Sequence, residues 1–498
     1  MKLRSTLFGL AAGAAAALLG SSAFAADLKC GLSNGKAATG APIPLGGIVS
    51  ITGPDNFSFS GFAAKAYFDC VNANGGINGR PIKYDLLDDG WNPEQASQDA
   101  AKLINNEKVV ALVGNMSFVD CGANQGAYEK ADVMVVAGVG VPRDCFFQKN
   151  YVTTNAGPRV SNTKTLMALA KKFPDIKRFV CFAPNIPNVG EWSCAGAVGW
   201  IKRNGGEGKT IVFDPGSLDA TSLVLQAMEF KPDAISVSTP KGLAVPIFAA
   251  AEEQGLIDKA HWMGPASLYN PTFPPAISKA WDGKVWVDME LNDAASTKPD
   301  NANWLAVLDK YAAKDLPRDT FSQAGYLAAR VVTDTLMKLD PAKIDRASVT
   351  AALRGVKHFD SDIWCATWYI GDAPRHNPNH TGPTSIVQGG MLVPQPGCID
   401  SQDPELDDVH AYEKSIGITK PSSVVTRDRG KTQAWARVIF ETGRYAGASW
   451  WSYYGPDWTV MGLWDRYGVS ASERPENLTV VSAVVKAAAA AIVRQIVP

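Results

Sequence analysis

Two short segments combine hydroxyl side chains with glycine where a strand is expected to turn into a helix. One contains Ser50 and Thr52 beside Gly53, and the other reads Gly114-Asn115-Met116-Ser117. The first N–H groups of a helix have no partner within the helix, and the helix dipole is positive at that end. A loop that leads into a helix can therefore bind a carboxylate or another hydrogen-bond acceptor. These hydroxyl residues are the first candidate ligand-binding residues, with helix capping as the alternative role of Ser117.

Eight cysteines, all beyond residue 29, indicate disulfide bonds in an exported chain. The sequence does not fix their connectivity. Proximity favours Cys121–Cys145, Cys181–Cys194 and Cys365–Cys398, which leaves Cys30–Cys70. The alternative is a zinc site, because His376 and His380 are four residues apart and Cys365 and Cys398 are nearby. Both histidines lie in a polar loop, so we expect no metal ion and no cofactor.

The first 25 residues have the features of a secretory signal peptide. Lys2 and Arg4 precede an apolar run at residues 7–19, and Ala23-Phe24-Ala25 forms a small-x-small cleavage site. The run is shorter than the roughly 20 apolar residues of a membrane-spanning helix. We therefore expect cleavage near Ala25 and a periplasmic or secreted protein.

The composition and the motifs exclude several classes of function. The chain has 48 basic and 49 acidic residues, so it offers no strongly basic surface for nucleic acid or anionic membrane. It contains no nucleophile elbow, metal-protease helix or phosphate loop in the part beyond the signal. We expect a protein that is not an enzyme.

From residue 42 onward, apolar strands alternate with amphipathic helices. Helices are expected at residues 60–73 and at about 92–104. The expected strands lie at residues 45–50, 82–87, 109–114, 133–137, 179–183, 210–213, 234–237 and 261–264. Such alternation indicates parallel sheets with helices on both faces. Ligands bind at the carboxyl ends of the strands in sheets of this kind.

Several motifs follow one another in a fixed order within about 70 residues. They are Ser50-Ile51-Thr52-Gly53-Pro54, Asn74-Gly75-Gly76-Ile77-Asn78-Gly79-Arg80-Pro81-Ile82, Asp88-Asp89, Asn92-Pro93 and Val113-Gly114-Asn115-Met116-Ser117. In this order and spacing they resemble the leucine/isoleucine/valine-binding protein family of ABC importer components. The resemblance covers roughly residues 42–415 and includes Val189-Gly190, Gly264-Pro265 and residues 285–289.

The resemblance implies an α/β fold of the type I periplasmic-binding-protein kind. Two lobes, each a parallel sheet flanked by helices, would be joined by three chain crossings and close over a ligand. The first lobe would comprise residues 42–155 and 285–345, and the second residues 156–284 and 346–415.

The resemblance also implies where a ligand binds in each lobe. In the first lobe, Ser117 and the backbone at Ala137 and Val139 would bind a carboxylate. Val139 stands where the family often has a hydroxyl residue. In the second lobe, contacts are expected at Val189 and Trp192, with the tryptophan in place of the family's usual tyrosine, and at Ala266 and Ser267.

Amino-acid binders of the family place an acidic residue after the strand that ends at Gly264-Pro265. This chain reads Ala266-Ser267-Leu268-Tyr269 there. A buried ammonium without a counter-charge costs several kcal/mol. We therefore expect a ligand other than a simple α-amino acid, such as a small aromatic or aliphatic carboxylate or a neutral amide.

Residues 418–498 are expected to form a small α+β appendage after a linker at Pro421-Ser422-Ser423. Helices are expected at 432–444 and 480–493, and aromatic-rich strands at 448–454 and 458–464. This part resembles a fragment of RES-domain proteins, with Ser452 at the position of that family's serine. The arginine and glutamate of that family would come from an N-terminal half that this tail lacks.

Together these features predict the extracytoplasmic substrate-binding subunit of an ABC importer. Its expected partners are a small organic solute and a membrane permease, with no nucleic acid. A ligand sensor for a membrane receptor is the first alternative, and an enzyme through the RES-like tail is the second.

Overall fold

The computed structural model describes residues 28–53, 56–418, 449–450 and 463–464. The chain divides into two units, Met1–Lys420 and Pro421–Pro498. In the second unit, β17 (Ser449–Trp450) and β18 (Leu463–Trp464) pair antiparallel. The predicted signal peptide, the linker, Ser452 and the two predicted C-terminal helices lie outside the described residues.

The first lobe is built on a parallel sheet with the strand order β6-β4-β1-β3-β5-β7, and β2 pairs with β1 on the side. Its strands are β1 (Ile43–Val49), β2 (Ile82–Asp88), β3 (Leu112–Val113), β4 (Met116–Ser117), β5 (Val135–Ala137), β6 (Val139–Gly140) and β7 (Tyr151–Thr153). The helices between these strands are α1 (Phe59–Ala73), α2 (Pro93–Ala101), which continues into a π-helical turn at Lys102–Asn106, and α3 (Asp120–Ala131).

The second lobe contains a mixed sheet with the order β15-β14-β12-β11-β10-β8-β9. Its parallel strands are β8 (Arg178–Pro184), β9 (Glu207–Phe213), β10 (Ala234–Val237), β11 (His261–Gly264) and β12 (Val285–Asp288). Two antiparallel strands, β14 (Thr384–Gln388) and β15 (Met391–Pro394), follow β12. The helices are α4 (Pro158–Lys172), α5 (Gly190–Arg203), α6 (Ala220–Glu229) and α7 (Lys241–Glu253). The two-lobed α/β fold is confirmed, but the second sheet is not wholly parallel.

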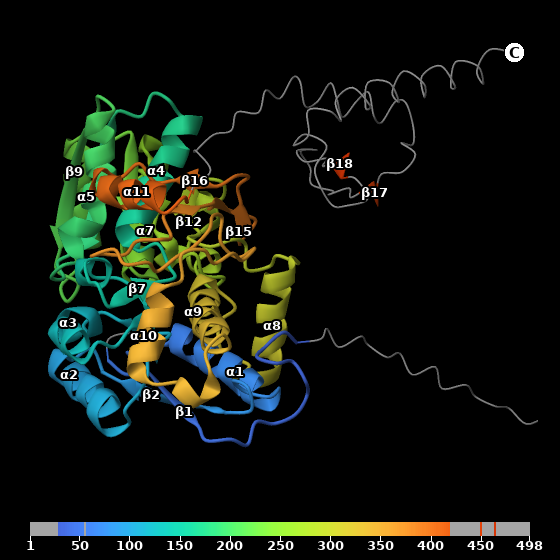
Figure 1. Cartoon of the computed structure of the whole chain (residues 1–498). Helices are drawn as coiled ribbons and strands as arrows, with labels where there is room; N and C mark the ends of the chain where they lie inside the picture. The colour runs from blue at the N-terminus through green and yellow to red at the C-terminus, as the bar shows by residue number, and fades with distance from the viewer. Residues whose placement is uncertain (1–27, 54–55, 419–448, 451–462, 465–498) are drawn as a thin grey trace, which may run out of the picture. The chain divides into compact units, whose positions relative to one another are not determined.

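The structure moves two of the predicted lobe boundaries. Strand β12 belongs to the second sheet, whereas α8 (Pro299–Tyr311) and α9 (Thr320–Leu336) pack against α1 in the first lobe. Helix α10 (Arg346–Arg354) also joins the first lobe, where Arg346 donates hydrogen bonds to the carbonyls of Ile104 and Val109. The chain crosses between the lobes near residues 154–157, 289–292 and 371–380 (Figure 1).

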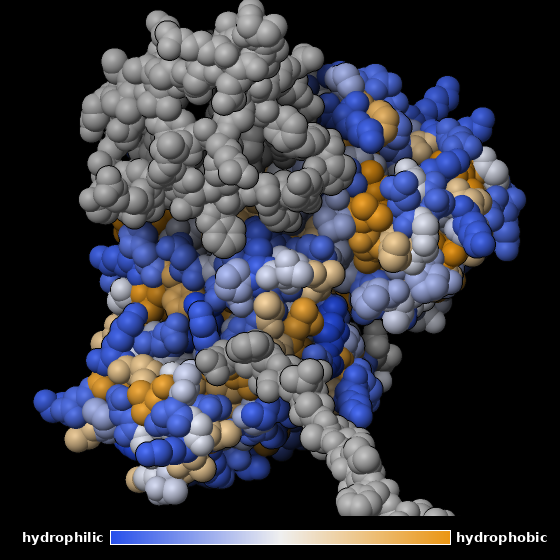
Figure 2. Space-filling model, turned by 90° about the vertical axis from the view of Figure 1, so that its right-hand side faces the viewer, coloured by the Kyte–Doolittle hydropathy of each residue, from blue (hydrophilic) through white to orange (hydrophobic). Residues whose placement is uncertain are grey.

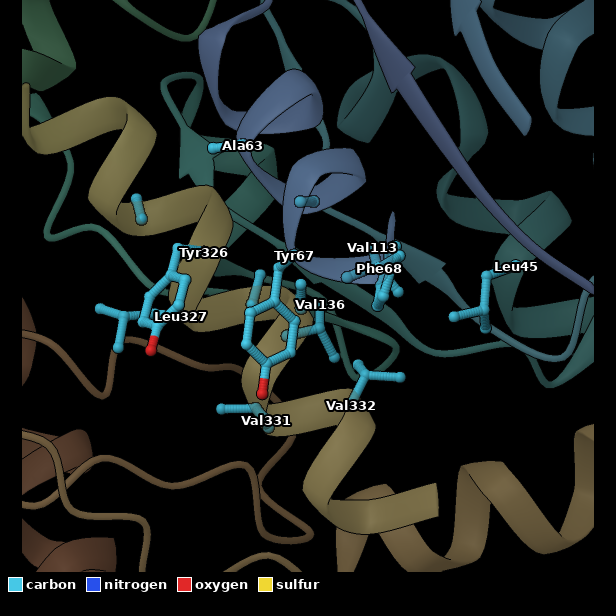
Figure 3. Close-up of a cluster of buried hydrophobic side chains, with 14 of the residues drawn as sticks. Leu45, Ala63, Tyr67, Phe68, Val113, Val136, Tyr326, Leu327, Val331 and Val332 are labelled. Atoms are coloured by element: carbon cyan, nitrogen blue, oxygen red, sulfur yellow. The ribbon is translucent and has the colours of Figure 1, made fainter. Parts of the chain in front are cut away.

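Helices α1 and α9 form the centre of the first core (Figure 3). The rings of Tyr67 and Tyr326 meet edge to face with centroids 5.1 Å apart. The helices approach closely at Gly325, where a Cβ atom would overlap the Ser60 backbone. Helix α9 begins at a capping box in which the Asp319 carboxylate accepts the backbone N–H of Ser322.

All four favoured disulfide pairs are confirmed: Cys30–Cys70, Cys121–Cys145, Cys181–Cys194 and Cys365–Cys398. The alternative zinc site, with Cys365 and Cys398 as ligands, is wrong because these two sulfurs are bonded to each other. His376 is fully buried near the first lobe, and its Nδ1 lies 2.9 Å from the Gln148 carbonyl.

Hydrophilic residues cover most of the described surface visible in Figure 2, with hydrophobic residues scattered among them. Within the described ranges, no helix has both the length and the apolarity that crossing a bilayer requires.

Candidate ligand-binding cleft

A cavity of about 200 Å³ lies between the two lobes. The first lobe contributes mainly aromatic side chains, and the second contributes small polar side chains from the strand ends. The aromatic residues are Phe57, Phe59, Trp91, Phe118 and Phe321, and the polar ones are Ser193, Ser238, Thr239 and Ser267. Asn155 and Glu290, on two of the chain crossings, also line the cavity.

The aromatic wall is a packed cluster. Trp91 and Phe118 are stacked, with centroids 4.2 Å apart and an interplanar angle of 17°. The ring centroid of Phe57 lies 4.8 Å from that of Phe118 and 5.8 Å from that of Phe321. Phe57 is positioned by two backbone hydrogen bonds to Ser50 just after β1 ends. This wall offers flat apolar surface to a ligand and few groups that could neutralise a charge.

Two polar atoms on the opposite side are buried without a hydrogen-bond partner among the described residues. They are the Thr239 hydroxyl oxygen and Glu290 Oε2. Thr239 is 2% exposed and follows β10, and Glu290 is also 2% exposed and follows β12. Leaving such groups unpaired costs about 1–3 kcal/mol each. A ligand that bonds to them recovers this free energy.

The other oxygen of Glu290 is held firmly. Oε1 accepts the N–H of Gly157 at 2.8 Å and lies 3.2 Å from the Ser161 hydroxyl. Burial, aided by the neighbouring Asp288 carboxylate, raises the pKa of Glu290 to about 7, although Lys164 opposes the shift. Lys164 lies 3.2 Å from Asp288 Oδ1, and both side chains are fully buried. Glu290 therefore changes its protonation state near neutral pH.

Asp319 is the second carboxylate at the cavity. Burial raises its pKa to about 6, although the N–H groups of Phe321 and Ser322 stabilise the charged form. Its oxygen is used as the cap of α9, so Asp319 orients Phe321 and adds negative charge to the first-lobe side.

Four of the residues predicted to bind the ligand line this cavity: Val139, Val189, Ala266 and Ser267. Val139 is in β6, and Val189 precedes α5. Ala266 and Ser267 lie in a short 3₁₀ turn after β11, where the Ser267 hydroxyl donates to the Thr239 carbonyl at 3.0 Å. These residues come from both lobes, as a closing cleft requires.

Ser50, Thr52 and Ser117 lie together but bond to protein groups. The Ser50 hydroxyl donates to Asp89 at 2.7 Å, and the Ser117 hydroxyl donates to the other oxygen of Asp89. Thr52 donates to Asp88 at 2.7 Å. Burial raises the pKa of Asp89, while the hydroxyls of Ser117 and Ser50 favour its ionised form.

Ser117 also caps α3. Its oxygen accepts the N–H groups of Val119 and Asp120, each at 3.0 Å. Both the donor and the acceptor capacity of this hydroxyl are therefore occupied, which matches the alternative role of Ser117. Contact of Ser50, Thr52 or Ser117 with a ligand stays a prediction.

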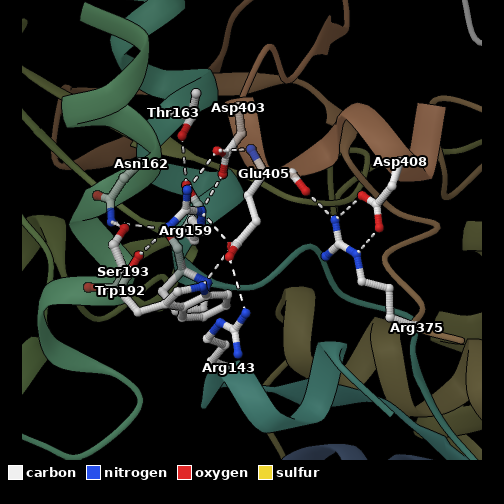
Figure 4. Close-up of polar contacts among 11 residues, drawn as sticks. Arg143, Arg159, Asn162, Thr163, Trp192, Ser193, Arg375, Asp403, Glu405 and Asp408 are labelled. Carbon is white, nitrogen blue, oxygen red and sulfur yellow. Dashed lines mark hydrogen bonds and ion pairs between the residues drawn. The ribbon is translucent and has the colours of Figure 1, made fainter. Parts of the chain in front are cut away.

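Ala137 and Trp192 are placed away from the cavity lining. Ala137 is buried within β5. The Trp192 indole donates to Glu405 at 2.9 Å, beside the ion pair of Arg159 and Asp403 (Figure 4). Trp192 and Arg159 thus hold the segment at residues 403–405 against α5 and α4. The aromatic residue that the second lobe contributes to the cavity is instead Tyr269.

Two acidic residues that line the cavity were not among the residues predicted from the sequence. No acidic residue follows Pro265, but Glu290 and Asp319 supply carboxylates from the crossing after β12 and from the start of α9. Neither residue belongs to a periodic sequence pattern, because both lie in irregular segments, after β12 and before α9. The one sequence feature that could have indicated them is their position, since each is an acidic residue beside the end of a strand or the start of a helix.

A family model described as "Periplasmic binding protein" matches residues 42–389. A curated relative, an "Amino acid binding protein" from Pseudomonas aeruginosa, is 29% identical over 96 residues. That alignment spans 18% of this chain and 25% of the relative.

Solved structures share the fold. A leucine-binding protein, LivK, from Thermotoga maritima superimposes with a TM-score of 0.60 at 19% identity, covering 73% of this chain and 99% of that one. A solute-binding protein of an ABC transporter from R. palustris, in complex with 4-hydroxybenzoate, gives a TM-score of 0.59 at 19% identity, covering 74% and 100%. At these identities the likeness concerns the fold.

Proposed function

The chain belongs to the periplasmic binding protein family, and from this premise we propose that it captures a small carboxylic acid in the cleft between its lobes and delivers it to the permease of an ABC importer. Membership of the family places the protein outside the cytoplasm and gives it a binding role rather than an enzymatic one. The observation that carries the proposal is the cavity lined by residues of both lobes.

The chemistry of the cavity supports an acid with an apolar body. The stacked rings of Trp91 and Phe118 offer a surface for an aromatic or aliphatic group. The Thr239 hydroxyl and Glu290 Oε2 offer hydrogen bonds at the opposite side. When Glu290 is protonated it donates to a carboxylate, and its pKa of about 7 makes this form available near neutral pH.

A comparison of ligands tests the proposal. The protein is purified, its bound small molecules are removed by denaturation and refolding, and the released molecules are identified by mass spectrometry. The refolded protein is then heated with 4-hydroxybenzoate, with octanoate and with leucine. We expect the acids that lack an amino group to raise the midpoint of unfolding more than leucine does. Stabilisation by leucine alone would contradict the proposed ligand class.

The transport role has a separate test. Deletion of the gene should abolish uptake of the identified acid while the cell's response to that acid persists. Normal uptake with loss of the response would instead support a ligand sensor for a membrane receptor.

A further inference from the structure

A compact group of two histidines and two carboxylates lies outside the cleft. His380 precedes β13 (Thr381–Gly382), and Asp400 ends β16 (Ile399–Asp400), which pairs antiparallel with β13. Helix α11 (Asp407–Ser415) carries His410 and Glu413, which are three residues apart and therefore share a face. The strand pair and this helix lie side by side (Figure 1) and bring the four side chains together.

The distances within the group are short. His380 Nδ1 lies 2.6 Å from Asp400 Oδ1, and His380 Nε2 lies 2.9 Å from Glu413 Oε1. His410 Nε2 lies 3.9 Å from Asp400 Oδ2. The two imidazole rings are 4.8 Å apart at 78°. One ligand atom from each of His380, Asp400 and His410 falls within 4.8 Å of the others.

His410 supplies the observation that points to a ligand. Its Nε2 is shielded from solvent but has no hydrogen-bond partner among the described residues. A buried ring nitrogen is normally bonded, and an unbonded one costs free energy. The facing Asp400 Oδ2 is too distant for a hydrogen bond, so the gap between these atoms suits an ion that bonds to both.

Glu413 orients His380. A histidine that binds a metal usually donates its other N–H to a carboxylate, which fixes the tautomer and makes the ligand nitrogen more basic. Glu413 Oε1 is placed to accept from Nε2, which leaves Nδ1 facing the Asp400 side.

We propose that His380 Nδ1, Asp400 Oδ2 and His410 Nε2 bind one zinc ion, with Glu413 as the carboxylate that orients His380. Zinc prefers imidazole and carboxylate ligands at about 2.0–2.2 Å, and tetrahedral ligand atoms then lie about 3.4 Å apart. The 3.9 Å gap closes by a small rotation of His410, whose side chain is 30% exposed. A water molecule completes the four ligands.

The ion would connect α11 to the chain crossing at residues 371–380. Asn379, next to His380, donates to the carbonyls of Thr154 at 2.9 Å and Glu290 at 3.3 Å, on the other two crossings. The zinc ion would therefore stabilise the three chain crossings between the lobes. None of its proposed ligands lines the cavity.

Isothermal titration with zinc chloride tests the site. The protein is prepared without a polyhistidine tag and stripped with a chelator. All eight cysteines are in disulfides, so thiolates do not compete. We expect one zinc per chain with a micromolar or tighter Kd, and a raised unfolding midpoint. Magnesium should not bind, because it prefers oxygen ligands.

Variants separate this site from adventitious binding. H410A should weaken zinc binding at least about a hundredfold, and E413Q about tenfold. H358A, which removes an exposed histidine elsewhere, is the control and should bind like the wild type. Circular dichroism checks that each variant is folded. Absence of stoichiometric binding, or equal affinity in H410A, would overturn the proposal and leave His380 as a metal-free hydrogen-bonding bridge between Asp400 and Glu413.

Discussion

Glu290 Oε1 accepts a hydrogen bond from the backbone N–H of Gly157 at 2.8 Å, so one carboxylate joins two of the crossings between the lobes. The same side chain lines the cavity, and its second oxygen has no hydrogen-bond partner among the described residues. Glu290 therefore both links two chain crossings and lines the cavity, and its pKa is raised to about 7.

The affinity for a carboxylic acid should depend on pH through Glu290. Burial raises its pKa to about 7, so the side chain is protonated below that pH and ionised above it. A bound carboxylate needs the protonated form, so its affinity should fall by up to about tenfold per unit as the pH rises beyond 7. Titration calorimetry between pH 6 and 8 measures this slope.

The matched variant for that measurement is E290Q, which keeps the shape but stays neutral. Its affinity for the acid should be independent of pH over the same range. An affinity of the wild type that rises with pH would indicate a cationic ligand that pairs with ionised Glu290.

Truncation of the aromatic wall should weaken ligand binding. F118A removes the ring that stacks on Trp91 at 4.2 Å and contacts Phe57. The lost apolar contact corresponds to at least about tenfold in Kd. F62A, on the outer side of α1 where the ring is 37% exposed, is the control and should leave Kd unchanged. Equal affinity of F118A and the wild type would place the ligand elsewhere.

The disulfide that closes the longer loop should stabilise the fold more. Cys30–Cys70 spans 40 residues, and Cys181–Cys194 spans 13. By loop entropy these bonds contribute about 4 and about 3 kcal/mol. Denaturant unfolding of C30S/C70S and of C181S/C194S should therefore show the larger loss in the former, and the opposite order would argue against the entropic account.

Loss of the ion pair between Arg159 and Asp403 should destabilise the second lobe. Two hydrogen bonds of 2.6 and 2.9 Å join them, with only 11% and 1% of their side chains exposed. D403A removes both bonds and leaves Glu405, 3.1 Å away, as the remaining ion-pair partner of Arg159, so it should cost about 2–3 kcal/mol. D69A breaks an exposed pair with Lys65 and should cost below about 1 kcal/mol. Equal unfolding midpoints for the two variants would contradict this assignment.

Much of the architecture followed from local patterns in the sequence. Apolar runs between turn residues correctly predicted β1, β2, β8, β10 and β11 and the helix at Phe59–Ala73, because burial of one face imposes a period on the chain. Proximity along the chain favoured three of the disulfide pairs and left Cys30–Cys70 as the fourth, and the structure contains all four.

The cleft depended on contacts between distant segments. Sequence patterns put hydroxyls at Ser50 and Ser117, but only the fold brought Asp89 between them. Likewise, Glu290 reaches the cavity because β12 pairs within the second sheet before the chain crosses to α8. The local sequence specifies which polar side chains are present, whereas the packing of distant segments determines which hydrogen-bond partners they have. The sequence by itself determined the strand and helix order and the supply of polar groups at the strand ends, and the tertiary structure decided which of those groups remain free for a ligand.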